Sequence, residues 1–74
     1  MVLDLNIIKD DDGFNAEVPS IKGCECWANN EEEAILKSVE LVKYYLKLPE
    51  SNKVNVDIAR KIDNKKIFKL IFDK

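Results

Sequence analysis

The first 28 residues alternate between apolar and polar side chains in three short runs. Alternation with a period of two is typical of a half-buried strand, whose side chains point to opposite faces. Asp12 and Gly13 separate the first two runs and predict a hairpin, because glycine accepts a positive φ at little cost. Pro19 ends the second run, and the turn up to Gly23 leads into the third. We therefore predict an antiparallel meander of three strands. Its inner-face side chains are expected to be Leu3, Leu5, Ile7, Phe14, Ala16, Val18, Cys24, Cys26 and Ala28.

Residues 31–48 carry a helical pattern. Asn30 is a favoured N-cap, and the three glutamates after it complement the positive end of the helix dipole. Pro49 marks the end of the helix. Leu36 and Tyr44 lie off the apolar stripe, among charged residues. The predicted core stripe of the helix consists of Ala34, Ile35, Ser38, Leu41, Val42, Tyr45 and Leu46.

The strand pattern returns after the predicted helix. Alternating apolar residues occupy 54–58 and 68–72, and Asp63 and Asn64 form a plausible turn between them. We predict a C-terminal β-hairpin; a single longer strand with a frayed end is the alternative. Residues 1–74 then form one α+β domain of order β-β-β-α-β(-β), an antiparallel sheet with one helix packed on one face. The other face needs a second copy, a partner or side chains that tolerate solvent.

The size of the chain changes what this fold needs. A chain of 74 residues buries only about 60% of the surface that its unfolded form exposes, so its stability needs support. Cys24 and Cys26 lie two apart on one predicted strand, a spacing that does not suit a disulfide. The sequence has no histidine, the commonest transition-metal ligand and general base. We therefore expect no catalytic residue, metal or cofactor, and we expect a homodimer or higher homo-oligomer.

The N-terminal sequence bears on the compartment. Residues 1–8 contain an early acid and lack the basic start of a signal peptide. No apolar run approaches the ~20 residues that cross a bilayer. With free cysteines, these features predict a cytoplasmic protein without a membrane partner.

Charge is distributed unevenly along the chain. Residues 1–40 carry ten acids against three lysines, a net charge of −7, whereas residues 41–74 carry a net charge of +5. The acidic half attracts a basic protein. At −2 overall, the chain lacks the basic profile of a dedicated nucleic-acid binder.

Several motifs occur in order between residues 12 and 34. An Asp-Gly turn precedes an aromatic residue and an Ala-Glu-hydrophobic-Pro run, a Gly-Cys pair follows, and a capped helix opens with Glu-Glu-Ala. In these motifs, residues 3 to about 48 resemble the HicB-like antitoxin family. The resemblance is carried by Asp12, Gly13, Phe14, Asn15, Ala16, Glu17, Val18, Pro19, Gly23, Cys24, Asn29, Asn30, Glu31, Glu32, Glu33 and Ala34.

The resemblance implies a partial ribonuclease-H-like fold made of three strands, a helix and a further strand. It also implies a function, the binding and neutralisation of a HicA-type toxin, which is a small basic RNA-cleaving protein. Many family members carry a C-terminal DNA-binding module, and we expect no separate module of this kind within residues 1–74. The open alternatives are a nucleic-acid-binding regulator and a stand-alone oligomeric binding module.

The predicted partner-binding surface combines acids with an exposed aromatic side chain. Trp27 points away from the two cysteines, so we expect it on the uncovered face of the sheet. A large exposed aromatic residue favours an interface with a partner or a second copy. Leu36 and Tyr44 are further candidates. The acids that we expect to meet a basic toxin are Asp10, Asp11, Asp12, Glu17 and Glu25.

The other reactive groups have structural interpretations that we favour. Asp4 with a glutamate of the helix start resembles the carboxylates that hold Mg²⁺ in ribonuclease-H-like enzymes, yet turn carboxylates serve folding and solubility first. Cys24 and Cys26, without further ligands, are a weak metal signal and pack as small core residues. The basic segment 60–66 protects an edge strand from aggregation more readily than it binds phosphates.

Overall fold

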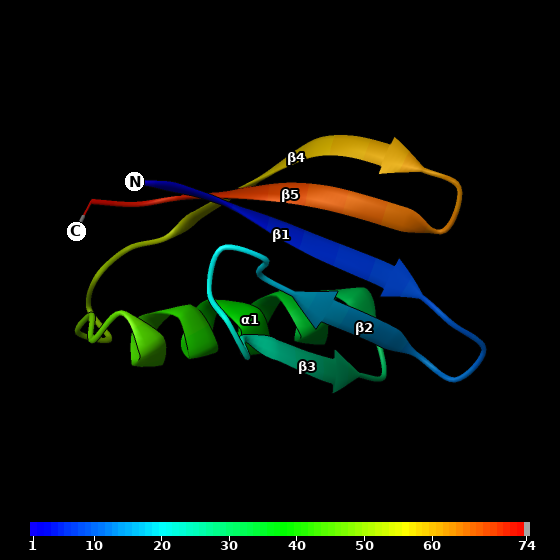
Figure 1. Cartoon of the computed structure of the whole chain (residues 1–74), viewed down its shortest axis with the longest axis horizontal. Coiled ribbons are helices and arrows are strands. Elements are labelled where there is room, and N and C mark those ends of the chain that lie inside the picture. The colour runs from blue at the N-terminus through cyan, green and yellow to red at the C-terminus, as the bar shows by residue number, and fades with distance from the viewer. Residues whose placement is uncertain (74) are drawn as a thin grey trace.

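The computed structural model describes residues 1–73 and contains one helix and five strands in that range (Figure 1). The strands form one antiparallel sheet in the order β3-β2-β1-β5-β4. The elements are β1 (Val2–Lys9), β2 (Phe14–Glu17), β3 (Glu25–Ala28), α1 (Glu31–Tyr45), β4 (Asn55–Ile62) and β5 (Lys65–Ile71). The predicted α+β class, N-terminal meander and C-terminal hairpin are therefore confirmed.

The first strand of the sequence is the central strand of the sheet. β1 pairs with β2 on one side and with β5 on the other. Leu5 lies opposite Phe68 of β5, and Leu5 and Leu70 are completely buried. The same pairing brings the start of β1 and the end of β5 side by side (Figure 1). The Met1 ammonium group donates to the Phe72 carbonyl oxygen at 2.7 Å.

The helix covers the half of the sheet that precedes it in the sequence. α1 packs on β1, β2 and β3, and β4 and β5 extend beyond it (Figure 1). Its buried stripe consists of Ala34, Ser38 and Val42, which are four residues apart. The Ser38 hydroxyl is the polar group in this stripe, and it donates to the Ala34 carbonyl oxygen at 2.8 Å. A buried hydroxyl thus keeps a hydrogen-bond partner within the helix.

Two details of the predicted helix are wrong. The pattern predicts Tyr45 in the core, but its side chain is 42% exposed and its hydroxyl donates to the Gly23 carbonyl oxygen at 3.2 Å. A phenol in the last turn needs a polar partner, and the loop before β3 supplies one. The helix also ends at Tyr45 rather than near Leu48, because Lys47 adopts a positive φ of 56° and Leu48 donates back to the Lys43 carbonyl at 2.8 Å.

The start of the helix follows the predicted cap. The Asn30 side-chain oxygen accepts a hydrogen bond from the Glu33 amide at 2.8 Å. Replacing Asn30 by alanine is expected to lower the free energy of unfolding by about 1 kcal/mol, because this amide then has no partner in the protein. Urea unfolding followed by circular dichroism measures the change. Asn29→Ala is the control, and an equal loss in both variants would contradict the capping role.

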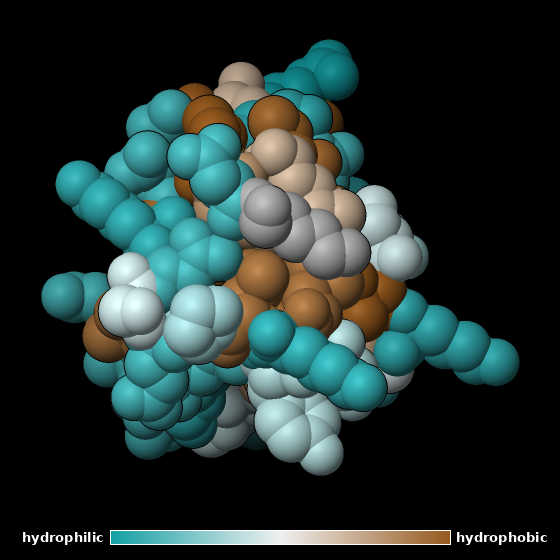
Figure 2. Space-filling view, turned by 90° about the vertical axis from the view of Figure 1, so that its left-hand side faces the viewer, coloured by the Kyte–Doolittle hydropathy of each residue, from teal (hydrophilic) through white to brown (hydrophobic). Residues whose placement is uncertain are grey.

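The segment between α1 and β4 closes one end of the core. Leu46, Leu48 and Val54 are half-buried and pack against the buried cluster. Figure 2 views the end of the molecule where this segment lies, and shows apolar residues exposed between polar ones. Within residues 1–73, no helix has the length and apolar character that a membrane crossing requires.

Candidate partner-binding site

The face of the sheet opposite α1, which we term the open face, carries the second set of alternating side chains. Because Leu3, Leu5 and Ile7 point toward the core, the residues between them point to the open face. Strand register places the alternate residues of the other strands there as well. Its exposed large apolar side chains are Val2, Ile8, Trp27, Ile62 and Ile71.

Trp27 lies on the open face, as predicted, and is 42% exposed. Its ring lies against Gly13, where an added Cβ atom would approach Trp27 Cζ2 and the Ala28 carbonyl oxygen to 2.5 Å each. The predicted reason for this glycine is wrong, because Gly13 has no positive φ and Gly23 is the glycine with one, at 82°. Gly13 is needed for space beneath the indole, a contact that local sequence does not reveal.

The three aspartates of the turn between β1 and β2 have different roles: Asp10 is structural, and Asp11 and Asp12 are exposed and their carboxylates make no such contacts to the turn. Asp10 Oδ1 accepts from the amides of Asp12 and Gly13 at 3.0 and 2.8 Å, and Asp10 Oδ2 accepts from Asn15 Nδ2 at 2.7 Å. Asp10 therefore fixes the turn. Asp11 and Asp12 are exposed beside the glycine that supports Trp27.

Two further acids lie next to each other on the open face. Glu17 of β2 is directly opposite Glu25 of β3, and both side chains are exposed. Asn6 of β1 donates to Glu17 at 3.4 Å. The three ion pairs among residues 1–73 do not include either glutamate. Like charges directly opposite on neighbouring strands repel one another, so a cationic partner would relieve this pair.

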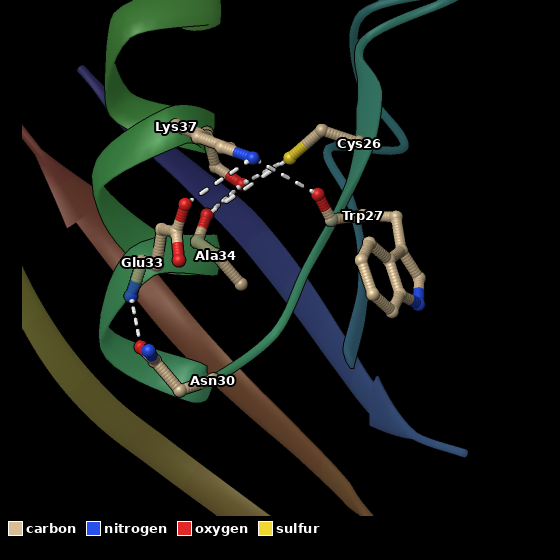
Figure 3. Close-up of polar contacts among 7 residues, drawn as sticks. Cys26, Trp27, Asn30, Glu33, Ala34 and Lys37 are labelled. Atoms are coloured by element: carbon tan, nitrogen blue, oxygen red, sulfur yellow. Dashed lines mark hydrogen bonds and ion pairs between the residues drawn. The ribbon is translucent and has the colours of Figure 1, made fainter. Parts of the chain in front are cut away.

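The free edge of β3 is covered by the helix. Lys37 Nζ lies 3.3 Å from the Trp27 carbonyl oxygen, to which it donates, and 3.4 Å from Glu33 Oε1 (Figure 3). Figure 3 also shows the indole on the side away from α1. The hydrogen bond from Lys37 to the Trp27 carbonyl was not predicted from the sequence, although the four-residue spacing from Glu33 indicates the ion pair. A lysine side chain that occupies a backbone carbonyl of an edge strand opposes pairing with another strand at that position.

The predicted site residues thus fall into separate groups. Glu25 and Trp27 share one face of β3, and Asp11 and Asp12 lie at the adjoining turn. Leu36 and Tyr44 are exposed on α1, which covers the opposite face of the sheet. The structure therefore brings the acids and Trp27 together and separates them from the two helix candidates.

The remaining residues of the family-like motifs have structural roles. Pro19 is the second residue of a turn closed by the Ile21 amide and the Val18 carbonyl at 3.0 Å. Gly23 supplies the positive φ of the next turn. Of the other motif residues, Phe14 is half-buried, Glu33 pairs with Lys37, and three are buried: Ala16, Cys24 and Ala34.

The side chains considered as metal ligands, and those considered as phosphate-binding groups, do not come together at one site. Asp4 lies on the open face and pairs with Lys69, whereas Glu33 lies on α1 across the sheet. Residues 1–73 contain no group of three or more His, Cys, Asp or Glu side chains placed to hold a metal ion. In the basic segment, Arg60 points to the open face and Lys61 to the opposite one, so its charge is divided between two faces.

The two thiols pack as core residues, as predicted. Cys24 is buried, and Cys26 Sγ lies 3.6 Å from the Ser38 hydroxyl. Burial, and to a smaller extent the neighbouring Cys26, raises the pKa of Cys24 above its ordinary value of 9.0. The folded state therefore holds the thiol proton more tightly than the unfolded state does.

This pKa shift predicts a loss of stability in alkali. The Cys24 contribution is fully present below pH 9.0, and it is lost as the pH rises from there through the higher pKa of the folded state. Urea unfolding at pH 8 and pH 10 gives the free energy of unfolding of wild type and of Cys24→Ala, and the difference between the two proteins at each pH is the Cys24 contribution. Wild type is expected to lose more stability than the variant over this interval. An equal loss in both proteins would contradict the assignment.

Comparison of the chain with family models, with curated proteins and with solved structures gave no match.

Proposed function

We propose that this protein is an antitoxin-like inhibitor of the HicB-like type, with a partial ribonuclease-H-like domain, which binds and neutralises a HicA-type toxin. The observation that carries the proposal is the pair of neighbouring carboxylates, Glu17 and Glu25, beside the exposed Trp27. The family-like motifs support it, as does the order of a three-stranded meander followed by a helix and further strands.

In the proposed mechanism, charged residues speed association and an apolar contact slows dissociation. The carboxylates of Asp11, Asp12, Glu17 and Glu25 attract the basic RNA-binding surface of the toxin and speed the encounter. Trp27 then packs against the toxin and slows dissociation, since buried aromatic residues dominate the energy of many interfaces. The toxin is inactive in the complex because its RNA-binding surface is covered. In this mechanism the antitoxin acts by binding alone and needs no catalytic activity.

We predict that the gene next to the one for this chain encodes a small basic toxin, and the test co-expresses the two proteins. Co-expression should abolish its toxicity, and the two proteins should purify together. Glu17→Gln with Glu25→Gln keeps the side-chain shape and removes two charges. Stopped-flow fluorescence at low salt should then show an association rate about tenfold lower, with a weaker dependence on salt.

Glu40→Gln is the matched control, because Glu40 is exposed on α1, away from the open face. This variant should associate at the wild-type rate. Two results would reject the proposal. One is a wild-type chain that neither co-purifies with the neighbouring protein nor relieves its toxicity. The other is a control variant whose association rate falls as much as that of the double variant.

A further inference from the structure

We infer that the open face is a self-complementary interface, through which two copies of this chain form a twofold-symmetric dimer with the axis along β1. In such a contact the same surface is used by both copies, and each residue meets the residue at the symmetry-related position. Stacked sheets keep their strand directions within about 30° of each other. An axis along the central strand therefore sets β3 of one copy over β4 of the other.

Strand register shows what this arrangement brings together. One row across the open face has Trp27 at the β3 edge, Ile8 at the centre and Ile62 at the β4 edge, with the polar Asn15 and Lys65 on the strands between them. The twofold axis places Trp27 over Ile62 of the second copy, and Ile8 over Ile8. All three side chains are among the exposed large apolar residues of the protein. The dimer would bury them against one another.

The next row carries the charges. Glu25 lies at the β3 edge and Arg60 at the β4 edge, with Asn6 on β1 between them. The same axis sets Glu25 of one copy against Arg60 of the other, twice per dimer. Glu17, beside Glu25 in this row, comes over Ile67 of the other copy and accepts from Asn6 of its own chain. The axis also sets Asp4 over its symmetry mate, and each Asp4 is paired with Lys69 of its own chain. The face is therefore complementary to itself in charge at the two Glu25–Arg60 contacts and in apolar contact at the Trp27–Ile62 and Ile8–Ile8 contacts.

The edges of the sheet favour stacking by faces over pairing by strands. Lys37 covers the backbone at the β3 edge. β4, at the other edge, carries an irregularity in register between Ile58 and Arg60, followed by a run of basic side chains. Irregular, charged edges oppose the addition of another strand.

The size of the face predicts a weak dimer. Five strands about 4.8 Å apart and about six residues long present a face of about 500 Å² per copy. The total of about 1,000 Å² lies at the lower limit for a specific interface. We therefore expect an equilibrium between monomer and dimer at micromolar concentrations, detectable on the isolated chain. The inference does not depend on the proposed toxin, although a toxin that covers Trp27 and Glu25 would compete with the second copy.

The test exchanges the two charges separately. Glu25→Arg places two arginines against each other at both symmetry-related contacts, and Arg60→Glu places two glutamates there. Each variant alone should raise the dimer dissociation constant at least about tenfold in sedimentation velocity at low salt. An equimolar mixture of the two variants should dimerise as wild type does, because both contacts between positions 25 and 60 then pair an arginine with a glutamate. Positions 25 and 60 lie on opposite edges of the same sheet, so a contact between them within one chain cannot explain the recovery of dimerisation in the mixture.

Circular dichroism confirms that both variants remain folded, and Glu40→Arg, a charge reversal on α1 away from the open face, is the control that should dimerise normally. Recovery in the mixture, with neither variant dimerising alone, establishes the contact between positions 25 and 60. A wild-type chain that stays monomeric up to millimolar concentration would overturn the inference. So would a dimer that both charge reversals leave unchanged, or a mixture that does not recover.

Discussion

Leu5→Ala is expected to remove between about a quarter and all of the free energy of unfolding at 25 °C. Leu5 is completely buried on the central strand, opposite Phe68 of β5. Removing three carbons there loses transfer free energy and leaves a cavity, which together cost about 3 to 5 kcal/mol. A chain of 74 residues has a total stability of about 4 to 11 kcal/mol. One substitution therefore removes a large part of what keeps the domain folded.

Urea unfolding of Leu5→Ala, followed by circular dichroism, measures this loss against a matched control. Leu36→Ala removes the same atoms from a side chain that is 59% exposed on α1, and its effect should stay within about 0.5 kcal/mol. If the first variant unfolds at the wild-type urea concentration, the placement of β1 at the centre of the core is wrong. A comparable loss in both variants would show that burial does not decide the difference.

The elements of this fold were predictable because their signals are local. Strict alternation marks the strands, Asn30 marks the start of the helix, and Asp63 with Asn64 marks the second hairpin. The central position of β1 was not predictable, because it depends on pairing with β5, which lies some 60 residues along the chain. Alternation predicts which side chains share a face of one strand. It contains no information on which distant strand lies alongside.

The same distinction applies to the candidate site. Alternation placed Trp27 and Glu25 on the open face, and the structure agrees. Three features depend on tertiary contacts that no local pattern encodes: the opposition of Glu17 to Glu25, the hydrogen bond from Lys37 to the β3 edge, and the separation of Trp27 from Tyr44. The exposure of Tyr45 was missed for a similar reason. Its partner, the Gly23 carbonyl, belongs to a loop 22 residues earlier.

Gly13→Ala is expected to destabilise the protein although it adds a single methyl group. The new Cβ would lie 2.5 Å from both the Ala28 carbonyl oxygen and Trp27 Cζ2, distances at which one of the neighbours must move. Forcing an atom into a filled space of this kind costs about 2 to 3 kcal/mol. The indole can swing toward solvent, because it lies on the open face and is 42% exposed. The backbone of β3 cannot move without disturbing its pairing with β2.

A double-mutant cycle separates these two obstacles. Trp27→Ala removes the ring and leaves the carbonyl oxygen in place, so Gly13→Ala in that background should cost about half as much as in wild type. In the single variant, the emission of the sole tryptophan should shift toward longer wavelength as the displaced ring gains water. A cost that is unchanged by Trp27→Ala would mean that the ring does not rest on Gly13. The displaced ring should also weaken any complex formed through the open face, which would link this glycine to binding through the position of Trp27 rather than through a contact of its own.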